Sequence, residues 1–99
     1  MNLEVKTSSF KVETAGFGDI LNITGQVQRG LSESSLLDGN VTVFVSGSTA
    51  GITTIEYEPG AVDDLKKAIE RQAPANLHYA HDARWGDGNG FSHVRAALM

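Results

Sequence analysis

Residues 41–45 read Val-Thr-Val-Phe-Val, and this run has the strongest preference for β-structure in the chain. Its side chains are β-branched or aromatic and nearly all apolar, which is typical of a strand buried on both faces of a sheet. Residues 38–40, Asp-Gly-Asn, precede it and indicate a turn. The run therefore predicts a buried central β-strand, from which the other elements can be placed.

Further strands are predicted on both sides of this run. Residues 3–12 alternate between apolar and polar side chains, with a phase shift near residues 8–9 that indicates a bulge or bend. A glycine-containing turn at residues 15–18 separates them from a predicted strand at residues 19–23, so the two should form a hairpin. Another strand is predicted at residues 51–57.

Two main helices complete the predicted fold. The first is capped by Thr24, and the second opens at Pro59 and closes at Pro74; both place apolar residues on one face. The residues after Pro74 read as a loop as far as Gly90, and Ser92 can cap a last short helix or strand. This order of elements predicts an α+β domain with a mixed, mostly antiparallel sheet.

Length and composition bound the class of protein. Residues 1–99 suffice for a single small domain, and 40% apolar content can support a core. The formal net charge of −4 argues against a general affinity for nucleic acid. No run approaches the ~20 apolar residues of a membrane helix. The chain has no cysteine, which excludes disulfides and thiolate metal sites and favours the cytoplasm.

The segment 85–98, Trp-Gly-Asp-Gly-Asn-Gly-Phe-Ser-His-Val-Arg-Ala-Ala-Leu, gathers many polar groups on a glycine-rich loop and indicates a functional site. Asp87 and Asn89 could orient His93, a substrate hydroxyl or a hydrated cation. They could equally serve as turn formers, because both residue types tolerate unusual backbone angles. The planar fork of Arg95 suits a phosphate or a carboxylate.

The histidines suggest a metal site. His81 and His93 flank the glycine-rich loop, which could fold back and bring the two rings together. Neutral imidazole suits zinc and related ions, and a carboxylate from Asp87 or Glu56 could complete the site. The alternative is that both are ordinary loop histidines bonded to backbone or water. A calcium loop of the EF-hand type is rejected, because Leu98 occupies the position of the bidentate acid.

Two other groups could take part. Residues 46–51, Ser-Gly-Ser-Thr-Ala-Gly, let backbone N–H groups approach an anion, and the hydroxyls of Ser48 and Thr49 can donate to phosphate oxygens. The competing interpretation is a plain hairpin turn. Glu56 and Glu58 share one face of the predicted strand, where they could hold a divalent cation or transfer a proton, or simply lie in solvent.

The stretches 47–60 and 85–96 closely resemble the YjbQ family, whose members are described as secondary thiamine-phosphate synthase enzymes. The resemblance covers essentially the whole chain as far as Ala96. It implies a compact α+β fold with a mixed sheet folded on itself, assembled as a trimer. It also implies a site lined by Thr49, Glu56, His81, Asp87, Asn89 and His93.

The chain departs from the family pattern at several positions. Many relatives have histidine where this chain has Gly47, and relatives of the Gly-Ser-Thr-Ala branch often have histidine at the positions of Gly86 and Phe91. Relatives also continue beyond the end of this chain, through a Gly-Pro-Ser segment and further strands. The expectation is therefore a C-terminally truncated domain with an exposed sheet edge.

The resemblance implies an enzyme that joins a pyrimidine methyl diphosphate to a thiazole phosphate with loss of diphosphate. Such a reaction needs a cation and donors where negative charge grows. Glu56 and Asp87 would hold Mg²⁺, and His93 or His81 would move a proton. Phosphate and cofactor binding would fall to Ser48, Thr49, Asn89 and Arg95.

The alternative is a non-catalytic trimeric protein that binds a metal or an anion. Zn²⁺ would then be held by His81, His93 and Asp87. In both cases the expected partners are a small phosphorylated molecule and two further copies of the chain, with no nucleic acid and no membrane. The expected location is the cytoplasm.

Overall fold

The computed structural model describes residues 3–99, so the first two residues of the predicted 1–99 domain lie outside it. The chain divides into two compact units, Met1–Val43 and Phe44–Met99. The division falls inside residues 41–45, the run that predicts a central strand.

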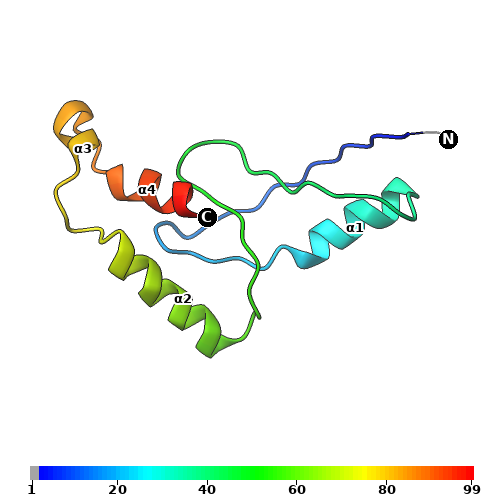
Figure 1. Cartoon of the computed structure of the whole chain (residues 1–99), viewed down its shortest axis with the longest axis horizontal. Coiled ribbons are helices and arrows are strands. Elements are labelled where there is room, and N and C mark those ends of the chain that lie inside the picture. Colours follow the sequence, from blue (N-terminus) through cyan, green and yellow to red (C-terminus); the bar gives the residue numbers. More distant parts are fainter. Residues whose placement is uncertain (1–2) are drawn as a thin grey trace. The chain divides into compact units, whose positions relative to one another are not determined.

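The prediction of an α+β fold with a folded sheet is wrong. Residues 3–99 contain four helices and no strand (Figure 1). The helices are α1 (Thr24–Ser34), α2 (Pro59–Gln72), α3 (Ala80–Trp85) and α4 (Gly90–Leu98). No described helix is both long enough and apolar enough to cross a membrane.

The physical reason lies in what β-propensity measures. Alternating or β-branched side chains fit a pleated surface, but a strand forms only when a neighbouring backbone pairs with its N–H and C=O groups. Residues 3–15, 19–23, 40–46 and 50–57 carry the pattern and make no such ladder in the described chain. Most of their apolar side chains stay exposed, as Val5 shows with 92% of its surface accessible.

In the first unit, the helix predicted from Thr24 is present but starts differently. Ile23 is the N-cap residue and supplies no side-chain cap, while Asn22 Oδ1 accepts a hydrogen bond from Thr24 N–H at 3.0 Å. Thr24 thus lies inside the helix and does not cap it. The helix ends at Ser35, whose φ of 61° is left-handed.

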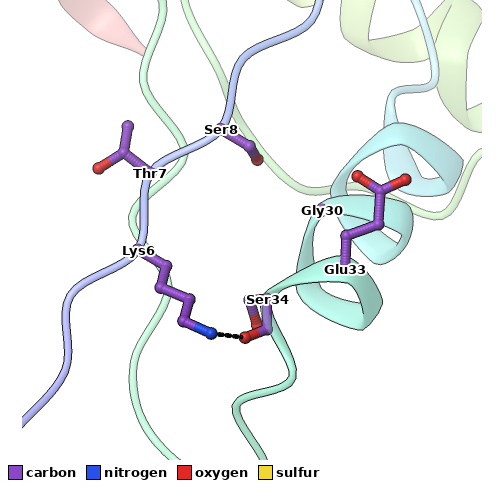
Figure 2. A pocket seen from close by; sticks show the side chains of 6 residues that line it. All are labelled: Lys6, Thr7, Ser8, Gly30, Glu33 and Ser34. Carbon is purple, nitrogen blue, oxygen red and sulfur yellow. Dashed lines mark hydrogen bonds between the residues drawn. The ribbon is translucent and has the colours of Figure 1, made fainter.

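The segment before α1 lies close to this helix because Gly30 has no side chain. A Cβ at Gly30 would lie 3.0 Å from Ser8 Oγ. Lys6 Nζ also donates to Ser34 O, as Figure 2 shows. A shallow hollow of about 150 Å³ remains between the two segments, and it is lined by Lys6, Thr7, Ser8, Gly30, Glu33 and Ser34.

In the second unit, the predicted helix from Pro59 to before Pro74 is confirmed as α2. Pro59 suits the first helical position because its fixed φ is already helical and its missing N–H needs no partner. Glu58 is the N-cap residue: its carboxylate accepts from Gly60 N–H at 2.9 Å and from Ala61 N–H. The Glu58 carboxylate, predicted to share a strand face with Glu56, therefore caps the helix.

Removal of this cap should weaken α2. We expect Glu58→Ala to lower the free energy of unfolding by about 1 kcal/mol, because two N–H groups lose their acceptor. Glu58→Gln keeps one acceptor oxygen and should lose less. Thermal unfolding followed by circular dichroism measures the difference; equal stability of Glu58→Ala and the parent chain would contradict this role.

One exposed ion pair lies on the surface of α2. Asp63 accepts from Lys67 Nζ at 2.8 Å, one helical turn away. This hydrogen bond, aided by the charge of Asp63, raises the pKa of Lys67 above its ordinary value of 10.5. Both side chains are largely solvated, so the pair makes little contribution to stability.

The last two helices pack against each other, although part of this region was predicted as loop. The α3 helix ends at Gly86, whose φ of 72° is left-handed, and α4 begins at Gly90, two residues before Ser92. Gly90 N–H donates to Asp82 Oδ1 at 2.8 Å, which ties the start of α4 to α3. The buried apolar residues of this unit are Ala73 and Phe91.

Candidate functional site

The two histidines singled out by the sequence lie against each other. His81 is on α3 and His93 is on α4, and their ring centroids are 4.5 Å apart with the planes tilted by 56°. Gly86 and Gly88, both with positive φ, let the backbone reverse between the two helices. The glycine-rich loop thus places side chains twelve positions apart in one place.

Two carboxylates face the ring of His81. The distance from His81 Nδ1 to Asp87 Oδ1 is 3.2 Å, and the distance to Asp82 Oδ1 is 3.5 Å. Even so, this nitrogen is shielded from solvent and makes no hydrogen bond of acceptable geometry with any described residue. Such a group costs about 1–3 kcal/mol, and a bound ion is one of the usual reasons for it.

These three side chains form a cluster with the composition of a metal site. One ligand atom each from His81, Asp82 and Asp87 can be chosen so that all lie within 4.8 Å of one another. All three side chains are partly exposed, so an ion could enter from solvent. With neutral imidazole the cluster carries two negative charges, which a divalent cation would balance.

Asp82 was missed by sequence analysis. Pro74 and the downstream glycines indicated a loop, and a loop gives no reason to place residue 82 beside residue 87. A helix predicted over residues 80–85 would have placed Asp82 next to His81 at the start of the glycine loop. Its second role, accepting from Gly90 N–H, depends on the fold of the loop and has no local signal.

The hydrogen bond at His93 identifies which ring nitrogen carries a hydrogen. His93 Nδ1 lies 3.0 Å from the carbonyl oxygen of Ser48. A carbonyl can only accept, so Nδ1 carries the hydrogen of this bond, and in the neutral ring the lone pair is then on Nε2. Ligand histidines are commonly oriented by such a bond to a backbone carbonyl. The bond also places the Ser-Gly-Ser-Thr turn beside the histidine pair.

Asn89 supports Asp87. With its amide nitrogen turned toward the carboxylate, Asn89 donates to Asp87 Oδ1 at 3.0 Å and to Oδ2 at 3.2 Å. Asn89 is also the N-cap residue of α4, although its side chain does not cap that helix. It therefore orients an acid of the cluster.

Other predicted site residues are placed elsewhere. Within residues 3–99, Glu56 is bonded through its carbonyl, which accepts from Glu58 N–H at 2.9 Å, and its carboxylate does not join the cluster. No contact places the Thr49 hydroxyl at the histidines. Arg95 Nε donates to the carbonyl of Ala73 at 2.9 Å, and Nη2 pairs with Glu70. Phosphate binding by Arg95 stays a prediction.

The structure thus defines a protein whose regular secondary structure within residues 3–99 is helical, with a histidine–aspartate cluster of the metal-site type. Its sequence shows the family. Residues 8–99 match the family described as UPF0047 protein YjbQ-like, and the chain belongs to this family.

Curated relatives from archaea agree with this assignment. A UPF0047 protein of Methanothermobacter thermautotrophicus is 31% identical over 97 residues, which cover 98% of this chain and 66% of the relative. One of Archaeoglobus fulgidus is 31% identical over 88 residues, 89% of this chain and 66% of the relative. One of Methanocaldococcus jannaschii is 26% identical over 91 residues, which cover 91% of this chain and 63% of the relative. The chain therefore spans slightly less than two thirds of these relatives, and no solved structure matches it.

Proposed function

We propose that this protein binds a divalent metal ion through His81, Asp82 and Asp87. The observation that carries this proposal is the solvent-shielded Nδ1 of His81, which faces two carboxylate oxygens and makes no hydrogen bond within residues 3–99. A proton on this nitrogen would have to satisfy both acids at poor angles, whereas an ion can be shared by all three groups. The imidazole favours Zn²⁺ over Mg²⁺, which prefers an all-oxygen set.

His93 lies beside this proposed site, although its ring nitrogens are not among the ligand atoms that gather within 4.8 Å. The bond to the Ser48 carbonyl uses Nδ1, not Nε2, and the His93 ring lies against that of His81. From this position His93 can hold a proton at Nε2. The Ser48 carbonyl belongs to the turn at residues 46–51, which offers small residues and hydroxyls for an anion.

The proposed reaction is the joining of a pyrimidine methyl diphosphate to a thiazole phosphate. A bond forms between the thiazole nitrogen and the pyrimidine methylene carbon, and the carbon–oxygen bond breaks as diphosphate leaves with its electron pair. A divalent ion at the cluster would neutralise charge on the departing diphosphate. His93 would donate a proton to that leaving group, and the turn at residues 46–51 would bind the second phosphate.

The second candidate is a non-catalytic protein that binds a metal or an anion. Its support is the position of Glu56, whose carboxylate does not join the cluster although the family resemblance places it in the site. In both candidates we propose a homotrimer, as the resemblance implies. Light scattering that finds only monomer would contradict the trimer.

The enzyme proposal is tested by measuring thiamine phosphate formation with Mg²⁺, Mn²⁺ or Zn²⁺. We expect His93→Ala to lower the rate about 100-fold or more, since proton transfer by a placed histidine contributes that much. Glu56→Gln should lower it as well if this acid takes part. His78→Ala, a change at an exposed histidine outside the cluster, is the matched control.

The outcomes separate the two candidates. Turnover in the parent chain that depends on His93 but not on His78 supports the enzyme. No turnover with any of the three ions, together with stoichiometric zinc by elemental analysis, rules out the enzyme and leaves the binding protein.

A further inference from the structure

We infer that Arg95 and Glu70 are positioning residues for His93. They hold α4 in place from the side of the helix opposite to the histidine. The expected effect on metal binding rests on the proposed function. The expected effect on the contact between the His81 and His93 rings does not need a metal.

Arg95 makes three contacts at the junction of α2 and α4. Its Nε donates to the carbonyl of Ala73 at 2.9 Å, its Nη2 pairs with the carboxylate of Glu70, and its guanidinium lies over the Phe91 ring, 4.9 Å from the centroid. Ala73 is 1% exposed and Phe91 is 6% exposed, so the contacts surround the best-packed part of the unit. The guanidinium is therefore held by contacts on several of its sides.

These contacts also provide a hydrogen-bond donor for a carbonyl group at the end of α2. Ala73 is the C-cap residue of that helix, and the last carbonyl groups of a helix have no partner within it. A guanidinium is well suited here because its planar fork can serve two acceptors at once. Glu70 Oε1 accepts from Ala75 N–H at 3.4 Å, so the same acid ties the segment after the helix to Arg95.

The geometry of α4 links this junction to the site. Successive residues of an α-helix are turned by about 100°, so positions two apart point to roughly opposite sides. Arg95 and His93 are two apart. On one side His93 is bonded to the Ser48 carbonyl, and on the other Arg95 is bonded to the end of α2. The two anchors together prevent rotation of α4, which would otherwise carry the His93 ring away from His81.

The test uses the full chain and two readouts. The first is the nuclear Overhauser effect between ring protons of His81 and His93 without metal; the second is the affinity and visible spectrum of bound Co²⁺. Arg95→Met removes the anchor and keeps much of the side-chain length, and Glu70→Gln removes only the charge. Asp63→Asn, which breaks the exposed pair with Lys67 on the same helix, is the matched control.

We expect Arg95→Met to lose the ring-to-ring effect, change the Co²⁺ spectrum and weaken binding about 10- to 100-fold, as for other outer partners of a ligand histidine. Glu70→Gln should weaken binding about two- to fivefold, because its pair with Arg95 is partly solvated. Asp63→Asn should change none of these quantities.

The inference is overturned if Arg95→Met keeps its helical circular dichroism, the nuclear Overhauser effect between the His81 and His93 rings, and the Co²⁺ spectrum of the parent chain. If Arg95→Met fails to fold, Glu70→Gln decides: an unchanged ring contact and an unchanged Co²⁺ affinity then overturn it. If the parent chain binds no Co²⁺ but the ring contact depends on Arg95, the proposed function fails and the positioning role stands.

Discussion

Replacing Gly90 by alanine is expected to disrupt the junction of α3 and α4. A Cβ at this position would lie 2.6 Å from Tyr79 Cβ and 3.0 Å from Asp82 Oδ1, and Tyr79 Cβ is fixed by its backbone. The helix start would have to move, which also breaks the bond from Gly90 N–H to Asp82. We expect a loss of about 3 kcal/mol in the free energy of unfolding of this unit.

A matched control exists in α1. Gly25 is also in the first turn of its helix, and a Cβ there would meet nothing within 4 Å. Gly25→Ala should therefore leave stability unchanged or raise it by up to about 1 kcal/mol, because alanine favours the helix. Urea unfolding of both variants compares them. Equal stability of Gly90→Ala and Gly25→Ala would show that the close contact at Gly90 is not rigid.

Replacing His81 by phenylalanine should have opposite effects on metal binding and stability. Zinc affinity should fall by more than the ~10- to 100-fold that loss of an outer-shell partner costs, because a ligand is removed. Without metal, the variant should be more stable by about 1 kcal/mol, since the shielded nitrogen without a partner is gone while a ring still faces His93.

Calorimetric titration with zinc and unfolding in chelator measure the two effects separately. His78→Phe is the control, and we expect it to leave the zinc affinity unchanged. A His81→Phe protein that binds zinc like the parent would show that the histidine–aspartate cluster is not the site.

The helices were predictable to the extent that their signals are local. Pro59, Pro74 and the apolar stripe between them lie within one segment, so the sequence located α2 closely. The strands failed for the converse reason. Residues 41–45 have the right side chains, but pairing depends on a second segment, and none supplies it within residues 3–99. The short α3 was missed because Pro74 before it and the glycines after it indicate a loop.

The site shows the same division. The glycine loop with Asp87, Asn89 and His93 is one local stretch, so its meeting with His81 could be anticipated from the reversal that glycine allows. The position of Asp82 in the cluster could not be anticipated, because it depends on α3. The position of Arg95 depends on its distant contacts with Ala73 and Glu70. The carboxylate of Glu58, predicted on one face with Glu56, is instead required by the N–H groups of α2.

The most direct test is a zinc titration of the ¹⁵N-labelled protein, followed through the ring nitrogens of its three histidines. We expect one equivalent of zinc to shift the His81 Nδ1 resonance by metal coordination, while the His78 ring nitrogens stay in place and His93 Nδ1 keeps its proton. A titration in which the His81 nitrogens do not shift, or in which His78 alone responds, would contradict a metal centre at His81, Asp82 and Asp87.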